Sequence, residues 1–110
     1  MNKKKLNRIG EVSISRITEN DRYMIHIIRK NWKKIVGDVI AEYSFPSFFS
    51  KGKLTVIVEN NLIMSEMKMY RETILENVNE EFQGTAVSEI YIKGGKIYNN
   101  RDIYNEHKET

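Results

Sequence analysis

Residue types that support acid–base catalysis, covalent catalysis or metal binding are sparse in this chain. The histidines are His26 and His107, and neither has a serine or carboxylate at a spacing that makes a nucleophile–base pair recognisable. The sequence has no cysteine, which excludes disulfides and thiolate metal sites. The carboxylates are spread along a predicted helix rather than clustered in a loop, and there is no P-loop. We therefore expect no enzyme activity, no catalytic residue, no metal, no cofactor and no small-molecule substrate.

The basic side chains carry the strongest chemical signal. Residues 1–34 hold ten Lys or Arg against three acids, whereas residues 35–110 hold eight bases against twelve acids. A field that is positive at one end and negative at the other attracts polyanions to the positive end. The alternative, that these charges merely solvate a helix, stays open from charge alone.

The first predicted helix separates this charge from an apolar face. Thr18 and Asp21 have the spacing of a capping box, so a helix should start there, and Pro46 requires it to end near residues 41–43. Steps of 100° per residue place on one buried arc Met24, Ile25, Ile28, Trp32, Ile35, Val36 and Val39. The neighbouring arc holds Arg22, His26, Arg29, Lys30 and Lys33, with Lys34 trailing. Trp32 is predicted to anchor the core, and a partner contact at the rim is the alternative.

A hairpin, a second helix and a third strand are predicted to follow. Phe45, Phe48 and Phe49 begin a first strand with Pro46 near its start, residues 50–53 turn with Gly52 at positive φ, and Leu54 opens an alternating strand. Asn60 or Asn61 caps the next helix, and Gly84 is expected to stop it. Its predicted buried arc is Ile63, Met64, Met67, Tyr70, Ile74, Leu75, Val78 and Phe82. Residues 86–93 form a third strand, and residues 96–98 can return as an edge strand.

The order α-β-β-α-β predicts the α+β class, with a three-stranded sheet and two helices packed on one face. We expect a basic N-terminal arm over residues 1–17, able to form a short helix, one α+β domain over 18–98, and a disordered tail over 99–110. No run approaches the roughly 18 apolar residues of a membrane helix, and no apolar segment of a signal peptide follows the basic start. A cytoplasmic protein without a membrane partner is therefore expected.

Binding to DNA, single- or double-stranded, is the activity that these patterns favour. The basic arc extends about 18 Å at 1.5 Å rise per residue, enough to meet several phosphates. Tyr43, Phe48, Phe49 and Tyr91 can stack on unpaired bases, although core burial is the favoured role of the two phenylalanines. The predicted nucleic-acid contacts are Lys3, Lys4, Lys5, Arg8, Arg22, Arg29, Lys30, Lys33, Lys34, Lys51 and Lys53.

An ordered set of short motifs adds a family resemblance. W-x-x-I-V-G runs from Trp32 to Gly37, A-x-x-S-x-P ends at Pro46, and G-x-L-x-V-x-V begins at Gly52 with Leu54 at its third position. Over residues 9–93 this order resembles the DciA family. The resemblance implies a KH-like domain that binds DNA and assists loading of the replicative helicase DnaB in bacterial DNA replication, with no covalent chemistry of its own. The chain lacks the G-x-x-G loop of RNA-binding KH domains, so their clamp on the nucleic-acid backbone is not expected.

Two other functions remain open from the sequence. One is an RNA-binding or ribosome-associated KH-like protein, and the other is an adaptor whose acidic second helix docks a basic protein. Met69 lies on the acidic side of that helix and is the candidate for a protein contact. Gly37 is assigned to close helix packing, and Gly52 to the hairpin turn.

Overall fold

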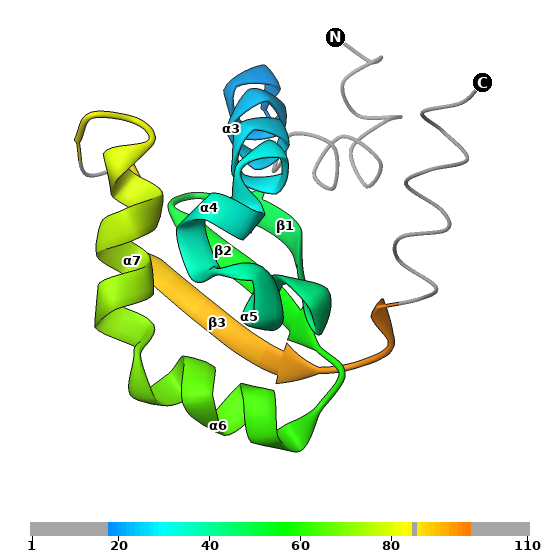
Figure 1. Ribbon diagram of the computed structural model, residues 1–110. Helices are drawn as coiled ribbons and strands as arrows, with labels where there is room; N and C mark the ends of the chain where they lie inside the picture. The colour runs from blue at the N-terminus through cyan, green and yellow to red at the C-terminus, as the bar shows by residue number, and fades with distance from the viewer. Residues whose placement is uncertain (1–17, 85, 98–110) are drawn as a thin grey trace, which may run out of the picture.

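The elements follow the predicted order, but each long helix is divided into shorter ones (Figure 1). In the computed structural model, which describes residues 18–84 and 86–97, the first region forms α3 (Glu19–Lys30), α4 (Trp32–Val36) and α5 (Asp38–Glu42). The strands β1 (Ser44–Ser50) and β2 (Lys53–Val58) come next, followed by α6 (Asn61–Met69), α7 (Arg71–Glu80) and β3 (Glu89–Gly94). The expectations for the N-terminal arm, for Tyr98 and for the tail lie outside the described residues.

The three strands form one mixed sheet in the order β1-β2-β3. β1 and β2 pair as an antiparallel hairpin, and the chain then crosses over through α6 and α7 to lay β3 parallel to β2. Alternate strand residues meet the helices in one core, to which the sheet contributes Phe49, Leu54, Val56, Val58, Ile90 and Ile92. The helices therefore cover one face of the sheet, and the predicted α+β class is confirmed.

The first helix begins as predicted but does not continue in one direction. Thr18 accepts from the backbone N–H of Asp21 at 3.0 Å, which completes the predicted capping box. Gly37 has φ of +93° and separates α4 from α5. A Cβ there would meet nothing within 4 Å, so Gly37 is needed for its backbone conformation, and its assignment to close packing was wrong. Because the helical projection fails across this break, Val39, which was predicted to be buried, is exposed.

A buried polar chain joins the first helical region to the sheet. The Trp32 indole N–H donates to the Ser44 hydroxyl at 2.9 Å, and that hydroxyl donates to the Ile40 carbonyl at 2.6 Å. Trp32 lies in the core, as predicted, and Ser44 is fully buried. A buried donor without a partner costs about 1–3 kcal/mol, so this chain fixes how α4 and α5 meet the start of β1.

The hairpin turn is held against the beginning of β3. Lys51 and Gly52 both have positive φ, 52° and 82°, as a two-residue turn of type I′ requires. The Gly52 carbonyl accepts from the backbone N–H groups of Ser88 at 2.8 Å and Glu89 at 3.2 Å. A Cβ at Gly52 would lie 2.8 Å from the Ser88 Oγ, so glycine serves both the turn and this contact.

The second helical region confirms its predicted start and corrects its middle and end. The Asn60 side chain accepts from the N–H groups of Leu62 and Ile63 and so caps α6. Tyr70, which was predicted to be buried, is exposed at the junction where α6 gives way to α7. The helix ends at Glu80, and the residue with positive φ beyond it is Gln83 rather than the predicted Gly84.

The third strand starts later than predicted because the Asn79 side chain binds the backbone of the residues that precede the strand. The Asn79 amide oxygen accepts from the N–H groups of Ala86 and Val87 at 2.9 and 2.7 Å, and its NH2 donates to the Val87 carbonyl. β3 therefore begins only at Glu89. Within the described part of the predicted edge strand, Ile97 does not pair but packs on Phe45 and Ile57, on the face of the sheet away from the helices.

Removing the Ser44 hydroxyl tests the buried polar chain. Ser44→Ala leaves the Trp32 N–H and the Ile40 carbonyl without that partner, so we expect the free energy of unfolding to fall by about 1–3 kcal/mol. Urea unfolding followed by the fluorescence of the single tryptophan measures this. Ser65→Ala, at an exposed helical position, is the matched control and should change stability by less than about 0.5 kcal/mol. Equal stability of the two variants would contradict the assignment.

Candidate nucleic-acid and partner interfaces

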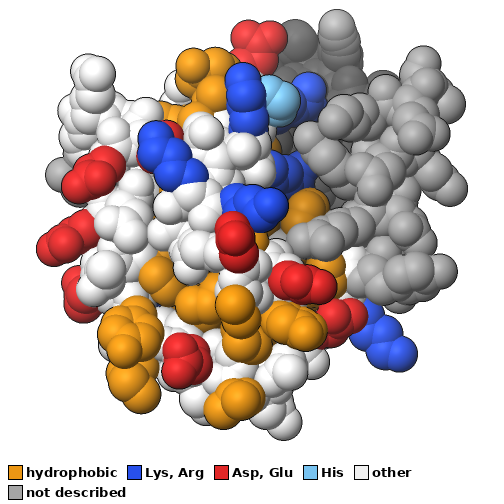
Figure 2. All heavy atoms as spheres, viewed as in Figure 1, with side chains coloured by type: hydrophobic (Ala, Val, Ile, Leu, Met, Phe, Trp, Pro, Cys, Tyr) orange, Lys and Arg blue, Asp and Glu red, His pale blue; other side chains and the backbone are white. Residues whose placement is uncertain are grey.

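Four basic side chains on α3 and α4 lie on the outer surface of the helical layer. Arg22, Lys30, Lys33 and Lys34 are all exposed, and we call them the basic face. They recur at helical spacing while Met24, Ile28 and Trp32 turn into the core. Figure 2 shows Lys and Arg side chains gathered over α3 and α4 in this view. Lys30 and Lys33 form no ion pair with any described residue, so both ammonium groups are open to a polyanion.

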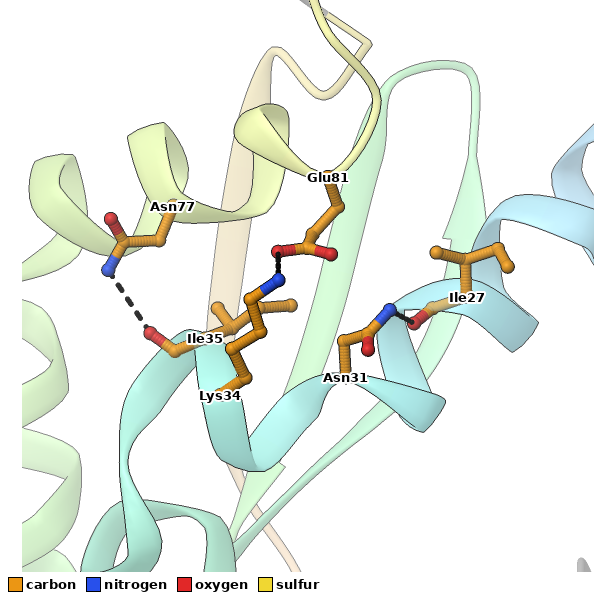
Figure 3. A network of polar contacts seen from close by, with 6 residues as sticks. All are labelled: Ile27, Asn31, Lys34, Ile35, Asn77 and Glu81. Carbon is orange, nitrogen blue, oxygen red and sulfur yellow. Dashed lines mark hydrogen bonds and ion pairs between the residues drawn. The ribbon is translucent and has the colours of Figure 1, made fainter.

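One member of the basic face also contacts the C-cap residue of α7 (Figure 3). The Lys34 Nζ lies 3.3 Å from Glu81 Oε2, and beside this ion pair the Asn77 amide donates to the Ile35 carbonyl at 3.1 Å. These contacts hold α4 against α7. The Lys34 side chain remains 72% exposed, so the ion pair stabilises the fold by no more than about 1 kcal/mol and leaves Lys34 accessible.

Arg29, which was predicted to contact nucleic acid, is partly buried and binds the backbone of β1. Its Nε donates to the Pro46 carbonyl at 2.9 Å and its Nη2 to the Ser47 carbonyl at 3.0 Å, with the guanidinium 4.8 Å above the Phe45 ring. The register of β1 against β2 shifts between Pro46 and Phe48, and Arg29 binds the carbonyls of this irregularity. It covers the edge of the sheet at β1.

The other predicted basic contacts divide between the hairpin and the N-terminus. Lys51 and Lys53 flank Gly52 and are exposed, and the Lys53 Nζ lies 4.9 Å above the Tyr91 ring. Lys3, Lys4, Lys5 and Arg8 lie outside the described residues. Contact of any of these side chains with nucleic acid stays a prediction.

The four aromatic residues predicted to stack on bases differ in burial. Phe49 is buried in the core, as favoured, but Phe48 is exposed, so the expectation of core burial was wrong for Phe48. Adjacent residues of a strand point to opposite faces, so Phe48 and Phe49 cannot both be inward. The register shift between Pro46 and Phe48 makes Phe49, opposite Leu54, the inward residue. Tyr43 and Tyr91 are also exposed.

A second surface feature lies between α5 and α6, and sequence reasoning missed it. It is a groove of about 480 Å³, which we call the acidic groove, lined by Val36, Gly37, Asp38, Val39, Ile40, Leu62, Ile63 and Glu66. Its charged lining residues are both acids, and Figure 2 shows hydrophobic side chains gathered over α5 and α6 among acidic ones. Met69 is 72% exposed and follows Leu62 and Glu66 at the i, i+4, i+7 spacing of one helix face. The sequence signal that could have indicated this groove is Leu62, a large apolar residue on the outer side of its predicted helix.

Within residues 18–84 and 86–97, no three His, Asp or Glu side chains gather closely enough to hold a metal ion. In the same ranges no helix has the length and apolarity to cross a membrane. The basic face and the acidic groove are two surfaces of opposite charge.

These features define a small α+β domain with a basic face and an acidic groove on its surface. The chain belongs to the DciA family: the family model described as "Dna[CI] antecedent, DciA" matches residues 7–92. The match confirms the predicted resemblance. The UPF0232 protein BL0636 of Bifidobacterium longum (strain NCC 2705) is 24% identical over 67 residues, 61% of this chain and 43% of that protein. The match thus spans less than half of this relative.

A stability measurement separates Arg29 from the basic face. Arg29→Ala removes two charge-assisted hydrogen bonds to carbonyls of β1, so we expect a loss of about 1–3 kcal/mol in urea unfolding. Lys30→Ala, the neighbouring exposed cation, is the matched control, with an expected change below about 0.5 kcal/mol. A neutral Arg29→Ala would show that its contacts to β1 do not stabilise the sheet.

Proposed function

We propose that this protein is a DNA-binding accessory factor that assists loading of the DnaB helicase in bacterial DNA replication, with the basic face on DNA and the acidic groove on a protein partner. The observation that carries the DNA-binding part is the exposure of Lys30 and Lys33 without a counter-ion among the described residues. Membership of the DciA family supports the helicase part. The proposal places the protein in the bacterial cytoplasm, where the chromosome is replicated.

Contacts of this kind recognise phosphates rather than bases. Arg22, Lys30 and Lys33 project from helices that the core fixes, so the backbone positions of the three residues are held relative to one another. Each phosphate neutralised releases condensed counter-ions, which makes affinity fall with salt and leaves it nearly independent of sequence. Such binding suits a factor that acts wherever a replication fork is assembled.

The acidic groove is the candidate surface for the helicase. An apolar groove with Asp38 and Glu66 in its lining accepts an apolar segment with basic flanks, whereas it repels the DNA backbone. Leu62 and Met69 extend the apolar surface beyond the groove along α6. The two surfaces can therefore be occupied together, DNA on one and protein on the other.

Charge reversal on the basic face tests DNA binding. Lys30→Glu with Lys33→Glu should weaken binding of a labelled DNA strand at least tenfold at low salt, because two attractive charges become repulsive to phosphate. The slope of log affinity against log salt should also shrink, by about 0.9 for each phosphate that is no longer neutralised on duplex DNA and by about 0.7 on a single strand. Fluorescence anisotropy across a salt series gives both quantities.

The matched control makes the same change in net charge elsewhere. Lys68→Glu with Arg71→Glu alters two exposed cations at the α6–α7 junction and should leave most of the affinity in place. Equal losses of affinity from the two pairs of substitutions would show that DNA binding depends on net charge alone. If the DNA affinity of the unaltered protein did not change with salt, the proposal of DNA binding would be refuted. Tighter binding to structured RNA than to DNA of equal length would favour the RNA-binding or ribosome-associated alternative.

Polar substitution at the acidic groove tests the helicase contact. Leu62→Ser with Met69→Ser removes exposed apolar surface, so capture of purified DnaB should fall several-fold while DNA affinity stays unchanged. Tyr23→Ser, an exposed apolar position on α3, is the control for loss of surface hydrophobicity. Nuclease is present throughout: capture that disappears with nuclease would mean that DNA, not a protein contact, bridges the two.

A further inference from the structure

The face of the sheet away from the helices carries a row of three side chains in register. Phe48 on β1 pairs with Thr55 on β2, which pairs with Tyr91 on β3. The strand neighbours of Thr55 and Tyr91 lie in the helix-side core, so alternation puts this row on the opposite face. Phe48 is 40% exposed and Tyr91 47% exposed. We call these three residues the aromatic row, and its two aromatic residues lie on strands that are two strand spacings, about 10 Å, apart.

The aromatic row is bordered by an apolar cluster at one end and by mostly basic side chains elsewhere. The apolar cluster consists of Phe45, Ile57 and Ile97, which pack on one another. At the other end is the hairpin tip, with Lys51 in the turn and Lys53 on the same face as Thr55. By the same alternation Lys93 shares this face with Tyr91, and the acid beside them is Glu89.

The contact between Lys53 and Tyr91 shows that one face of the Tyr91 ring is accessible to a bound group. The Lys53 Nζ lies 4.9 Å from the centroid of this ring, the geometry of a cation–π contact. At an exposed site such a contact is worth about two- to fivefold in an equilibrium constant, whereas a base stacked on an aromatic ring is worth about five- to 150-fold in affinity. An arriving base therefore displaces the ammonium group, which is then free to contact a phosphate.

We propose that the aromatic row binds single-stranded DNA by stacking unpaired bases on Phe48 and Tyr91, with Lys53 and Lys93 on the backbone. This rests on the proposed DNA binding and adds which form of DNA is preferred, because paired bases are unavailable for stacking. The basic face and the row lie on two sides of β1, joined where Arg29 on α3 binds the Ser47 carbonyl. One strand can pass around this edge and meet both.

The composition of the row favours a nucleic acid over a protein. The two rings are separated by Thr55 and rimmed by Lys53 and Lys93, so they do not merge into the contiguous apolar patch that marks protein interfaces. Separate rings with cations between them match a ligand that alternates flat apolar bases with anionic phosphates.

The experiment compares three DNA ligands of equal length and label: oligo(dT), an abasic strand and a duplex. Phe48→Leu with Tyr91→Leu removes both rings but keeps apolar strand residues, so folding is preserved. We expect oligo(dT) binding to fall at least tenfold, and binding of the abasic strand and duplex to change less than twofold. The matched control is Tyr70→Leu, whose ring is 49% exposed at the α6–α7 junction and should have no effect on any of the three.

The outcomes separate this inference from the proposed function. If the Phe48 and Tyr91 variants bind oligo(dT) normally while Lys30→Glu with Lys33→Glu abolishes binding, the aromatic row is not a base platform, although DNA binding stands. Equal losses on all three ligands would also overturn stacking. Loss of DnaB capture with intact oligo(dT) binding would reassign the row to a protein. Failure of the unaltered protein to bind any DNA would refute both proposals.

Discussion

The hydrogen-bond chain from Trp32 through Ser44 to Ile40 is the constraint on which the arrangement of surfaces depends. A serine hydroxyl with no exposed surface has nowhere else to satisfy its donor and acceptor, so rotating α4 against β1 would strand polar groups in an apolar core. The orientation of Trp32 in turn sets that of its neighbours. With the indole held inward, Lys33 and Lys34 lie on the outer side of α4 and are exposed to solvent.

Gly37 interrupts the first helical region between two surfaces of opposite charge. The basic face lies before it on α3 and α4, and the acidic groove lies beside and after it, between α5 and α6. Had the helix continued straight, Val39 would have joined the core, and Asp38 would have followed directly on the basic residues of α4. The positive φ of Gly37 therefore separates the site of attraction for a polyanion from the site of repulsion.

Local signals in the sequence predicted the order of elements, both N-caps, the hairpin turn and the inward Trp32, because each depends on residues within a few positions of one another. The errors lie where distant contacts decide. Val39 and Tyr70 were misplaced since projecting a helix assumes that it is unbroken. Phe48 was misplaced because the register shift between Pro46 and Phe48 depends on the partner strand. The contacts of Arg29 with β1 could not be predicted because its acceptors are 17 and 18 residues away. The acidic groove joins two helical regions, so no single stretch of sequence contained it.

The contact between Gly52 and Ser88 has a consequence for how the chain reaches its native state. These residues are 36 positions apart, and both the turn and the start of β3 must be formed before their hydrogen bonds can close. The hairpin is local and needs only its own turn, while β3 must wait for α6 and α7 to span the crossover. Pairing of β3 therefore costs more loop-closure entropy than formation of the hairpin, and this pairing completes the surface on which Tyr91 lies.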